Sequence, residues 1–433
     1  MSSYIKNKGW RVAISGTGIN LALGILYTWS IFKVAIKKSI EAGGENAFNW
    51  NIASLNDPYA VCCLVFAFAM ILAGKCQDRF GPRITAFMGG ILVGIGFIWI
   101  SQTTSYGSWI LGFGVLAGAG IGFGYSSATP PALKWFPPAK TGMIAGIVVS
   151  GFGLASVYIA PLAEFLLNSW GLQKAMLFFG VAFFIVVCGL SMLLVDPPEG
   201  YVPSEVNASK SDKGTSAKAQ KDLKPSEMMR TKLFYILWVV YFIGAGAGLM
   251  VIGSVAGMAK KSMGDMAFLV VALLAVGNAG GRITAGVLSD KIGRSSTLII
   301  MLLFQAVLMF ISIPLVAGEA GGAVIILLLA IFIGFNYGSN LSLFPSYTKD
   351  LWGLKNFGIN YGIVFTAWGV GGFVMGRLSQ MLVAKTGSYT TSFLTAGILL
   401  IAGAILTLTI RGGKQAGKAT DQQEEKLAFG ESQ

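Results

Sequence analysis

Residues 276–294 read VGNAGGRITAGVLSDKIGR, which is a glycine-rich apolar run that holds one arginine and ends in a charged loop. No acidic residue shares the apolar run with that arginine, Arg282. An arginine within a membrane-length apolar segment costs about 2.5–3.5 kcal/mol on insertion scales, so by default it is a functional residue. Whether this cost applies depends on whether the chain spans a membrane.

The composition is typical of a protein that crosses a membrane many times. Of 433 residues, 54% are hydrophobic, only 12% are charged and 58 are glycine, and the mean hydropathy is +0.69. The four cysteines lie in or beside apolar segments, which predicts small core residues without a disulfide framework. The chain has no histidine, which excludes histidine metal sites and a histidine proton relay.

Twelve apolar segments of about 20–28 residues remain when the chain is cut at its charged and Pro-, Asn- or Gly-rich breaks. Only helices satisfy their backbone hydrogen bonds in hydrocarbon at this length, so we expect twelve helices. The first is long enough to be a retained span and not a cleaved signal peptide. The predicted spans are residues 11–35, 55–75, 83–104, 108–133, 142–167, 172–195, 232–256, 264–288, 296–317, 321–345, 356–383 and 388–411.

The net charge of +13 is distributed unevenly along the chain. Most of the 32 Lys and Arg residues lie in the two termini and in the even-numbered loops between the predicted spans. This is the positive-inside pattern, and it predicts that both termini are cytoplasmic. The basic balance is therefore explained by topology. We expect membrane lipid, and no nucleic acid, among the partners.

The chain carries an internal repeat. Residues 74–83, GKCQDRFGPR, match residues 286–294 at an offset of 212 positions, and Tyr125 matches Tyr337 at the same offset. We therefore expect two six-helix halves in parallel orientation, which bind their ligand between them near the midplane. The predicted division is an N-terminal half (1–195), a polar cytoplasmic linker (196–231), a C-terminal half (232–411) and a cytoplasmic tail (412–433).

The repeated loop resembles the loop motif of the major facilitator superfamily. Within it, YTW at 27–29, KWFP at 134–137, and GGR at 280–282 followed by SDKIGR at 289–294 resemble the oxalate/formate antiporters and the monocarboxylate (lactate) transporters. The resemblance implies an all-α membrane protein with the major facilitator fold of 12 transmembrane helices. It also implies a multi-pass location in the cell membrane, the inner membrane of a bacterium.

Arg282 is the principal candidate for substrate binding. Side chains lean toward the N-terminal end of their helix, so its guanidinium is directed back toward the midplane, and its planar donors suit a carboxylate bidentately. The resemblance places the substrate's carboxylate at this position. The alternative is a structural arginine paired with backbone carbonyls or with an acid of another helix, but only Asp57 and Glu164 approach any span.

Two positions depart from the families that the chain resembles. Trp368 stands where oxalate exchangers carry a second cation, a lysine, so a single buried cation predicts a monocarboxylate such as lactate, pyruvate or formate. As an alternative, Trp368 is a packing residue. Asn278 stands where proton-coupled carriers have an aspartate; its amide does not titrate, but it can bind a substrate hydroxyl, orient Arg282 or join two helices.

Aromatic side chains complete the predicted substrate site. Tyr27, Tyr125 and Tyr337 supply hydroxyl groups at membrane depth, and Phe152 and Phe365 supply an apolar wall. Each of them could equally be a packing residue of the core.

Charged residues near the ends of the spans are candidates for gating. By resemblance, the repeated loops form contacts between the halves that hold the outward-open state and break on the inward swing; a plain anchoring role is the alternative. Arg377 could attract anions at the entrance, snorkel to the interface, or pair with Glu164 or Asp57. The gating candidates are Asp78, Arg79, Arg83, Asp290, Lys291, Arg294 and Arg377.

These features predict a secondary active transporter of small monocarboxylates that works by alternating access. A proton is the expected co-substrate, chiefly on the resemblance, and anion exchange of the oxalate/formate type is the alternative. No nucleophile–base pair or metal cluster is visible at membrane depth, so we expect no enzyme activity, no catalytic residues, no metal and no cofactor.

Overall fold

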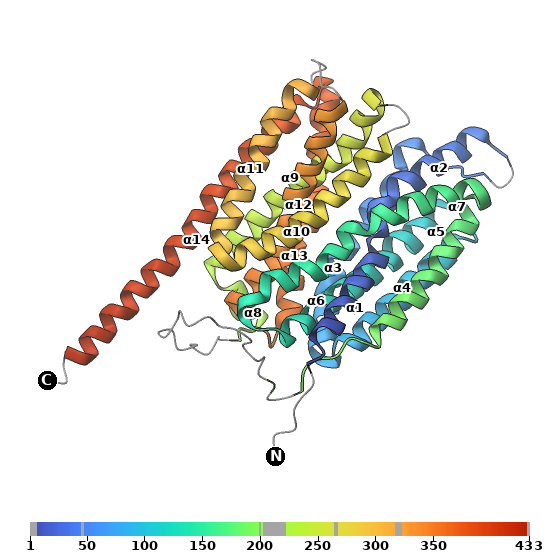
Figure 1. Ribbon diagram of the computed structural model, residues 1–433. Coiled ribbons are helices and arrows are strands. Elements are labelled where there is room, and N and C mark those ends of the chain that lie inside the picture. The colour runs from blue at the N-terminus through green and yellow to red at the C-terminus, as the bar shows by residue number, and fades with distance from the viewer. Residues whose placement is uncertain are drawn as a thin grey trace.

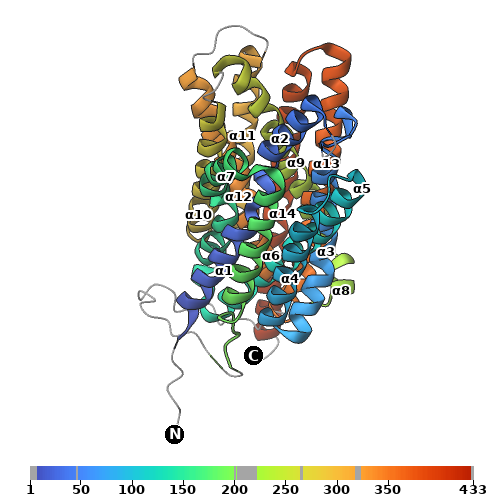
Figure 2. The same ribbon diagram turned by 90° about the vertical axis from the view of Figure 1, so that its right-hand side faces the viewer.

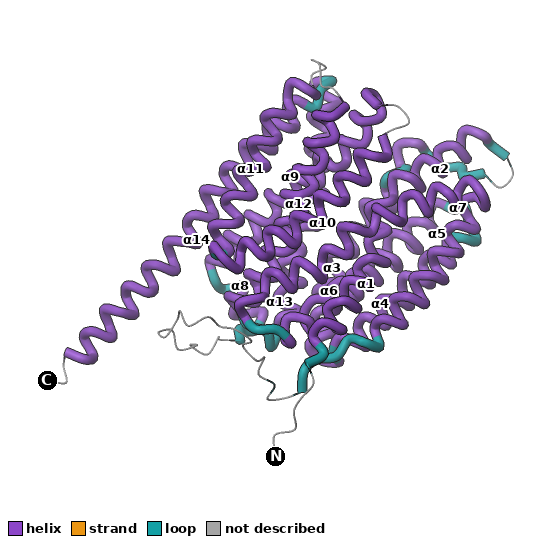
Figure 3. Tube along the Cα trace, in the orientation of Figure 1, coloured by secondary structure: helices purple, strands orange, loops and turns teal. Residues whose placement is uncertain are grey.

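The structure of the chain is a computed structural model that describes residues 7–44, 47–198, 201, 222–263, 267–316 and 323–430. Every long element in these ranges is a helix, and no strand occurs among them (Figure 3). Residues 202–221, which form most of the predicted linker, lie outside the described residues. α1 begins and α14 ends on the same face of the molecule (Figure 1), which we call the terminal face, in contrast to the opposite face.

The first half contains the helices before the linker, and they run back and forth between the two faces (Figures 1 and 2). Its elements are α1 (Gly9–Leu23), η1 (Gly24–Thr28), α2 (Trp29–Ala42), η2 (Ile52–Ser54), α3 (Asp57–Phe80), α4 (Pro82–Ile100), α5 (Tyr106–Trp109), η3 (Ile110–Ala117), α6 (Gly118–Trp135), η4 (Pro138–Lys140) and α7 (Thr141–Ser191).

The second half follows the linker and begins with a short helix at the terminal face. Its elements are α8 (Pro225–Met229), α9 (Lys232–Met263), α10 (Ala267–Ile292), α11 (Arg294–Val316), α12 (Ala323–Trp352), α13 (Phe357–Thr386) and α14 (Thr390–Gly430). The backbone of the predicted tail is therefore helical as far as Gly430.

Eleven helices of the described chain are long and apolar enough to cross a membrane. One of them spans Pro138–Ser191 and contains two of the predicted spans. Its helices meet at Gly171, whose φ of 78° and ψ of 172° lie outside the helical region. Glycine adopts a positive φ without the steric penalty of a Cβ atom, so the chain reverses direction there. The chain is a multi-pass, all-α membrane protein.

Two predicted spans are less regular than expected. The first span, predicted at 11–35, is interrupted by the 3-10 turn Gly24–Thr28 and continues as α2 to Ala42. A Cβ on Gly24 would collide with the backbone oxygen of Phe152, so close packing on α7 coincides with this irregular turn. The span predicted at 108–133 contains the π-helical segment Ile110–Ala117.

The two halves meet along two pairs of helices, α3 with α13 and α7 with α10. Near the terminal face, glycine allows backbone to touch backbone in both pairs. Gly74 packs on Gly358, and Gly142 packs on Gly286, so closely that a Cβ at Gly74, Gly142 or Gly286 would overlap the partner's backbone. Each pair thus sets the start of one repeated loop against the start of a helix of the other half.

Candidate functional site

Arg282 lies on α10 where this helix crosses α7. Its backbone packs on Gly146, and its Nε lies 3.3 Å from the position that a Cβ on Gly153 would occupy. The side chain is fully buried, with 0% of its surface exposed. Small residues on α7 therefore make room for a guanidinium group inside the molecule.

Every hydrogen-bond partner of Arg282 in the described chain is neutral. Its Nε donates to the side-chain oxygen of Asn278, one turn earlier, at 2.9 Å, and its Nη1 donates to the backbone oxygen of Val149. Nη2 is buried without a partner. Among the described residues, Arg282 forms no ion pair. The guanidinium thus keeps its charge uncompensated by protein and one donor edge unused.

An aromatic cluster lies beside the guanidinium. The ring of Phe152 lies 6.0 Å from its Cζ. Phe152 contacts the rings of Tyr27 and Tyr125 edge-on at 5.3 and 5.4 Å, and Tyr125 lies 5.5 Å from Phe365. Rings of both halves therefore meet next to the arginine, as expected for a site between the halves.

Beside this cluster, a chain of two hydrogen bonds joins the first half to the second. The hydroxyl of Tyr27 lies 2.7 Å from that of Tyr337, which also accepts a hydrogen bond of 2.8 Å from the indole nitrogen of Trp368. Trp368 stacks on Phe365 with 5.0 Å between centroids. Tyr125 and Tyr337 lie in the same cluster, and Phe152 and Tyr27 lie between them.

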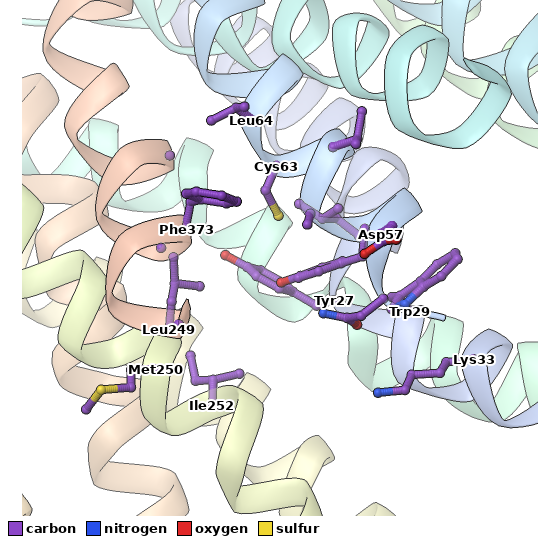
Figure 4. Close-up of a pocket in the computed structure, with 18 of the residues that line it drawn as sticks. Tyr27, Trp29, Lys33, Asp57, Cys63, Leu64, Leu249, Met250, Ile252 and Phe373 are labelled. Carbon is purple, nitrogen blue, oxygen red and sulfur yellow. The ribbon is translucent and has the colours of Figure 1, made fainter. Parts of the chain in front are cut away.

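A large cavity lies on the other side of these bonds and opens toward the opposite face. Its volume is about 1040 Å³, and its deeper wall includes Tyr27, Asn278 and Trp368. Figure 4 shows side chains of the first half, such as Cys63, facing those of the second, such as Phe373, across this space. Arg282 is not among its lining residues. Asn278, which lines the cavity and accepts from Nε of Arg282, brings the inner end of the cavity to within one side chain of the buried guanidinium.

Charged side chains line the outer part of the cavity. They are Lys33, Asp57 and Arg377. Asp57 accepts a hydrogen bond of 2.7 Å from the hydroxyl of Tyr106. Arg377 is exposed and forms no ion pair with Asp57 or Glu164, so the pairing considered from the sequence does not occur in this state.

The aspartates of the repeated loops make matching contacts across the halves at the terminal face. Asp78 of α3 accepts hydrogen bonds of 3.0 Å from the backbone nitrogens of Gly358 and Ile359, at the start of α13. Asp290 of α10 accepts bonds of 2.9 and 2.8 Å from Gly142 and Met143, at the start of α7. Each carboxylate binds the N-terminus of a helix of the other half, where the helix dipole favours a negative charge.

The second contact has additional ionic support. Arg294 pairs with Asp290 and, at 2.9 Å, with Asp350, and the buried Lys349 donates to Thr141 of the other half. The remaining gating candidates do not join these contacts: Arg79 lies over the ring of Phe80, and Arg83 and Lys291 are exposed. The described contacts across the terminal face therefore include the two aspartates and the Lys349–Thr141 bond, and ion pairs within the second half support Asp290.

Three residues of the cluster were missed from the sequence. Phe66 contacts the rings of Phe365 and Trp368 at 5.1 and 5.3 Å. Tyr241 and Tyr361 are buried, and their hydroxyls have no hydrogen-bond partner among the described atoms. Neither tyrosine has a counterpart at the 212-residue offset, and tyrosine at membrane depth is too common to single out. No group of acids and cysteines in the described chain is arranged to bind a metal.

Known proteins share both this sequence pattern and this fold. The chain matches the sequence profile of the Major Facilitator Superfamily over residues 12–376 and 262–431. It is 30% identical to the MFS-type transporter YhjX of Escherichia coli (strain K12) over 86% of this chain and 87% of that one. It is 28% identical to the oxalate:formate antiporter of Oxalobacter formigenes (89% and 88% covered), and 25% identical to human monocarboxylate transporter 11 (92% and 82% covered).

Solved structures share the fold at lower sequence identity. The proton:xylose symporter XylE superposes with a TM-score of 0.68 at 15% identity, over 93% of this chain and 96% of that one. The fucose:proton symporter FucP of E. coli gives 0.62 at 14% identity, over 92% and 98%. Because the profile and the transporter relatives cover most of the sequence, the chain belongs to the major facilitator superfamily of membrane transporters.

Proposed function

We propose that this chain is a secondary active transporter of small monocarboxylates, such as L-lactate or pyruvate, and that Arg282 binds the carboxylate. One observation carries the proposal: the guanidinium is fully buried, has only neutral partners in the described chain, and leaves Nη2 without a partner. A buried charge without a counter-ion costs several kcal/mol. A substrate carboxylate would remove that cost and occupy the free donor.

The surroundings of Arg282 favour an anion with one charge. Trp368 stacks on Phe365 of the cluster, and its indole is neutral. The indole nitrogen already donates a hydrogen bond to Tyr337. A second carboxylate placed against Trp368 and Phe365 would be buried without a cation, which is unfavourable. The names of the relatives, monocarboxylate transporter 11 and oxalate:formate antiporter, support a small carboxylate as substrate.

The state of the molecule fits alternating access. The cavity opens to the opposite face, while Asp78 and Asp290 close the terminal face. The positive-inside pattern makes the terminal face cytoplasmic, so this state is outward-open. Substrate entering from outside would pass Tyr27 and Tyr337 to reach Arg282, and rocking of the halves would then open the cytoplasmic side.

We propose that a proton travels with the anion, which makes transport of a monocarboxylate electroneutral. Anion exchange is the second candidate, and one observation favours it. In the described chain no carboxylate hydrogen-bonds to Arg282 or pairs with it, and its neighbour Asn278 is an amide. A proton carried by the protein therefore has no acidic site beside the bound anion.

Uptake of labelled L-lactate into proteoliposomes tests the proposal. Arg282→Gln should abolish uptake, whereas Arg11→Gln, at an exposed position at the start of α1, should leave it unchanged. Full uptake by the folded Arg282→Gln protein would refute the assignment. Uptake driven by an inside-alkaline gradient indicates symport, and uptake that ignores the gradient but requires internal anion indicates exchange.

A charge added to the aromatic wall gives a complementary test. Trp368→Lys supplies a second cation facing the cluster, so inhibition of lactate uptake by oxalate should strengthen. Trp368→Phe, which also removes the hydrogen bond to Tyr337 but adds no charge, is the matched control. Equal inhibition of both variants by oxalate would show that charge at this position does not select the substrate.

A further inference from the structure

Four polar atoms that lack a well-aligned hydrogen bond are buried in the aromatic cluster. They are Nη2 of Arg282 and the hydroxyl oxygens of Tyr125, Tyr241 and Tyr361. No more than 2% of any of these side chains is exposed. They come from four helices of both halves: α6, α9, α10 and α13.

The three tyrosines share one neighbour, Phe365. Its ring centroid lies 5.5 Å from that of Tyr125, 5.8 Å from that of Tyr361 and 6.2 Å from that of Tyr241. The hydroxyl of Tyr361 interacts with those of Tyr125 and Tyr241, although none of the three forms a well-aligned hydrogen bond. The hydroxyl of Tyr125 also interacts directly with the Arg282 guanidinium, and that of Tyr241 lies within its electrostatic reach. The three hydroxyls therefore lie together, and two of them lie close to the Arg282 guanidinium.

Buried hydroxyls of this kind are expected to have a hydrogen-bonding partner. The great majority of buried polar side-chain atoms in proteins are hydrogen-bonded, and a group of exceptions requires an explanation. Packing alone does not require the hydroxyls, because Phe66, Phe152 and Phe365 fill neighbouring positions of the same cluster without them. A water molecule or a polar part of the substrate is the kind of partner that such groups accept.

We propose that the hydroxyls of Tyr241 and Tyr361, with that of Tyr125, bind an oxygen on the carbon next to the substrate's carboxylate. The transporter would then prefer 2-hydroxy and 2-oxo monocarboxylates to unsubstituted acids of the same length. This inference rests on the proposed function, since Arg282 must hold the carboxylate for the neighbouring carbon to face the tyrosines.

The chemistry of the phenol group suits both kinds of substrate. A tyrosine hydroxyl donates to the oxygen of a 2-oxo acid and also accepts from the hydroxyl of a 2-hydroxy acid. Propionate has the length of lactate but offers only a methylene group there. Its binding would expel water and leave the hydroxyls unpaired, and sites built to bind a substrate hydroxyl reject the analogue that lacks it.

Competition against labelled L-lactate uptake in proteoliposomes tests the inference, with lactate, pyruvate and propionate as competitors. In the wild-type protein, lactate and pyruvate should inhibit at concentrations at least about tenfold lower than propionate. Tyr361→Phe and Tyr241→Phe should each reduce this preference several-fold, by weakening lactate and pyruvate while propionate inhibits as before. Tyr235→Phe, on an exposed tyrosine of α9, is the matched control.

The outcomes separate this inference from the proposed function. Equal inhibition by lactate and propionate in the wild type would overturn the inference, as would an unchanged preference in both Phe variants; the hydroxyls would then bind water only. Uptake of labelled propionate by the same variants, measured directly, shows that they are folded. Arg282→Gln, in contrast, should lose lactate and propionate together, so its failure to do so would count against the proposed function alone.

Discussion

Removing the charge of Asp78 or Asp290 should open the terminal face. Each carboxylate accepts two backbone hydrogen bonds from the first turn of a helix in the other half. An asparagine retains one neutral acceptor, so each substitution should cost the closed state roughly 2–4 kcal/mol, from hydrogen bonds to charged groups worth about 1.5–3 kcal/mol each. That cost corresponds to a shift of about 30- to 700-fold in the ratio of the two states.

The effect should be larger at Asp290. Its carboxylate also pairs with Arg294, and only 11% of each side chain is exposed. Losing this pair should add about 1 kcal/mol, because Arg294 keeps its second partner, Asp350. Asp78 forms no ion pair among the described residues. The two contacts are therefore alike in their backbone bonds and unequal in their ionic support.

Spin labels at Lys140→Cys and Lys232→Cys, exposed positions on the two halves, report the opening as a longer inter-label distance in a background without native cysteines. Asp222→Asn is the matched control. Its carboxylate also accepts two backbone bonds, of 2.9 and 3.0 Å, but from Leu354 and Lys355 and not across the halves. If Asp78→Asn and Asp290→Asn lengthen the distance no more than the control does, the aspartates do not hold this face closed.

Two further predictions concern packing and entry. Gly281→Ala should destabilise the protein by about 1–3 kcal/mol, because its Cβ would overlap the backbone oxygen of Phe335. Gly280→Ala, whose Cβ meets open space, is the control and should be neutral. Equal melting temperatures of the two variants would contradict this packing. Replacing both Lys33 and Arg377 of the outer cavity by Gln should raise the KM for lactate at low salt, because the two positive charges attract the anion. The difference from the wild type should vanish near 1 M salt, where exposed charges are screened. A rise in KM that persists at high salt would exclude electrostatic attraction as its cause.

The fold was predictable because it depends on patterns that recur along the chain. Apolar length fixed the number of spans, and the repeat between residues 74–83 and 286–294 indicated two halves. The contact between Asn278 and Arg282 was also predictable, since residues four apart share a helix face. Breaks such as Gly24–Thr28 were not, because they depend on what packs against the helix.

The partners of the site residues were harder to predict. The acceptor for Nη1 of Arg282 is the backbone oxygen of Val149, and the donors to Asp78 are backbone nitrogens. Backbone groups occur at every residue and leave no mark in the sequence. Likewise, Tyr241 and Tyr361 become notable only when the structure shows their hydroxyls buried without partners. Their surroundings in the fold, and not their residue type, distinguish these two tyrosines from the others.

The glycine pairs at the terminal face bear on how the two halves can part. Where Gly74 meets Gly358 and Gly142 meets Gly286, the surfaces in contact are bare backbone. Separating them requires no side chain to change rotamer. This part of the interface between the halves therefore adds little side-chain entropy cost or repacking to the barrier of the conformational change. The resistance to opening is concentrated instead in a few electrostatic bonds, which break over a short displacement. An interface of this kind between the halves favours an abrupt switch between two states over gradual deformation.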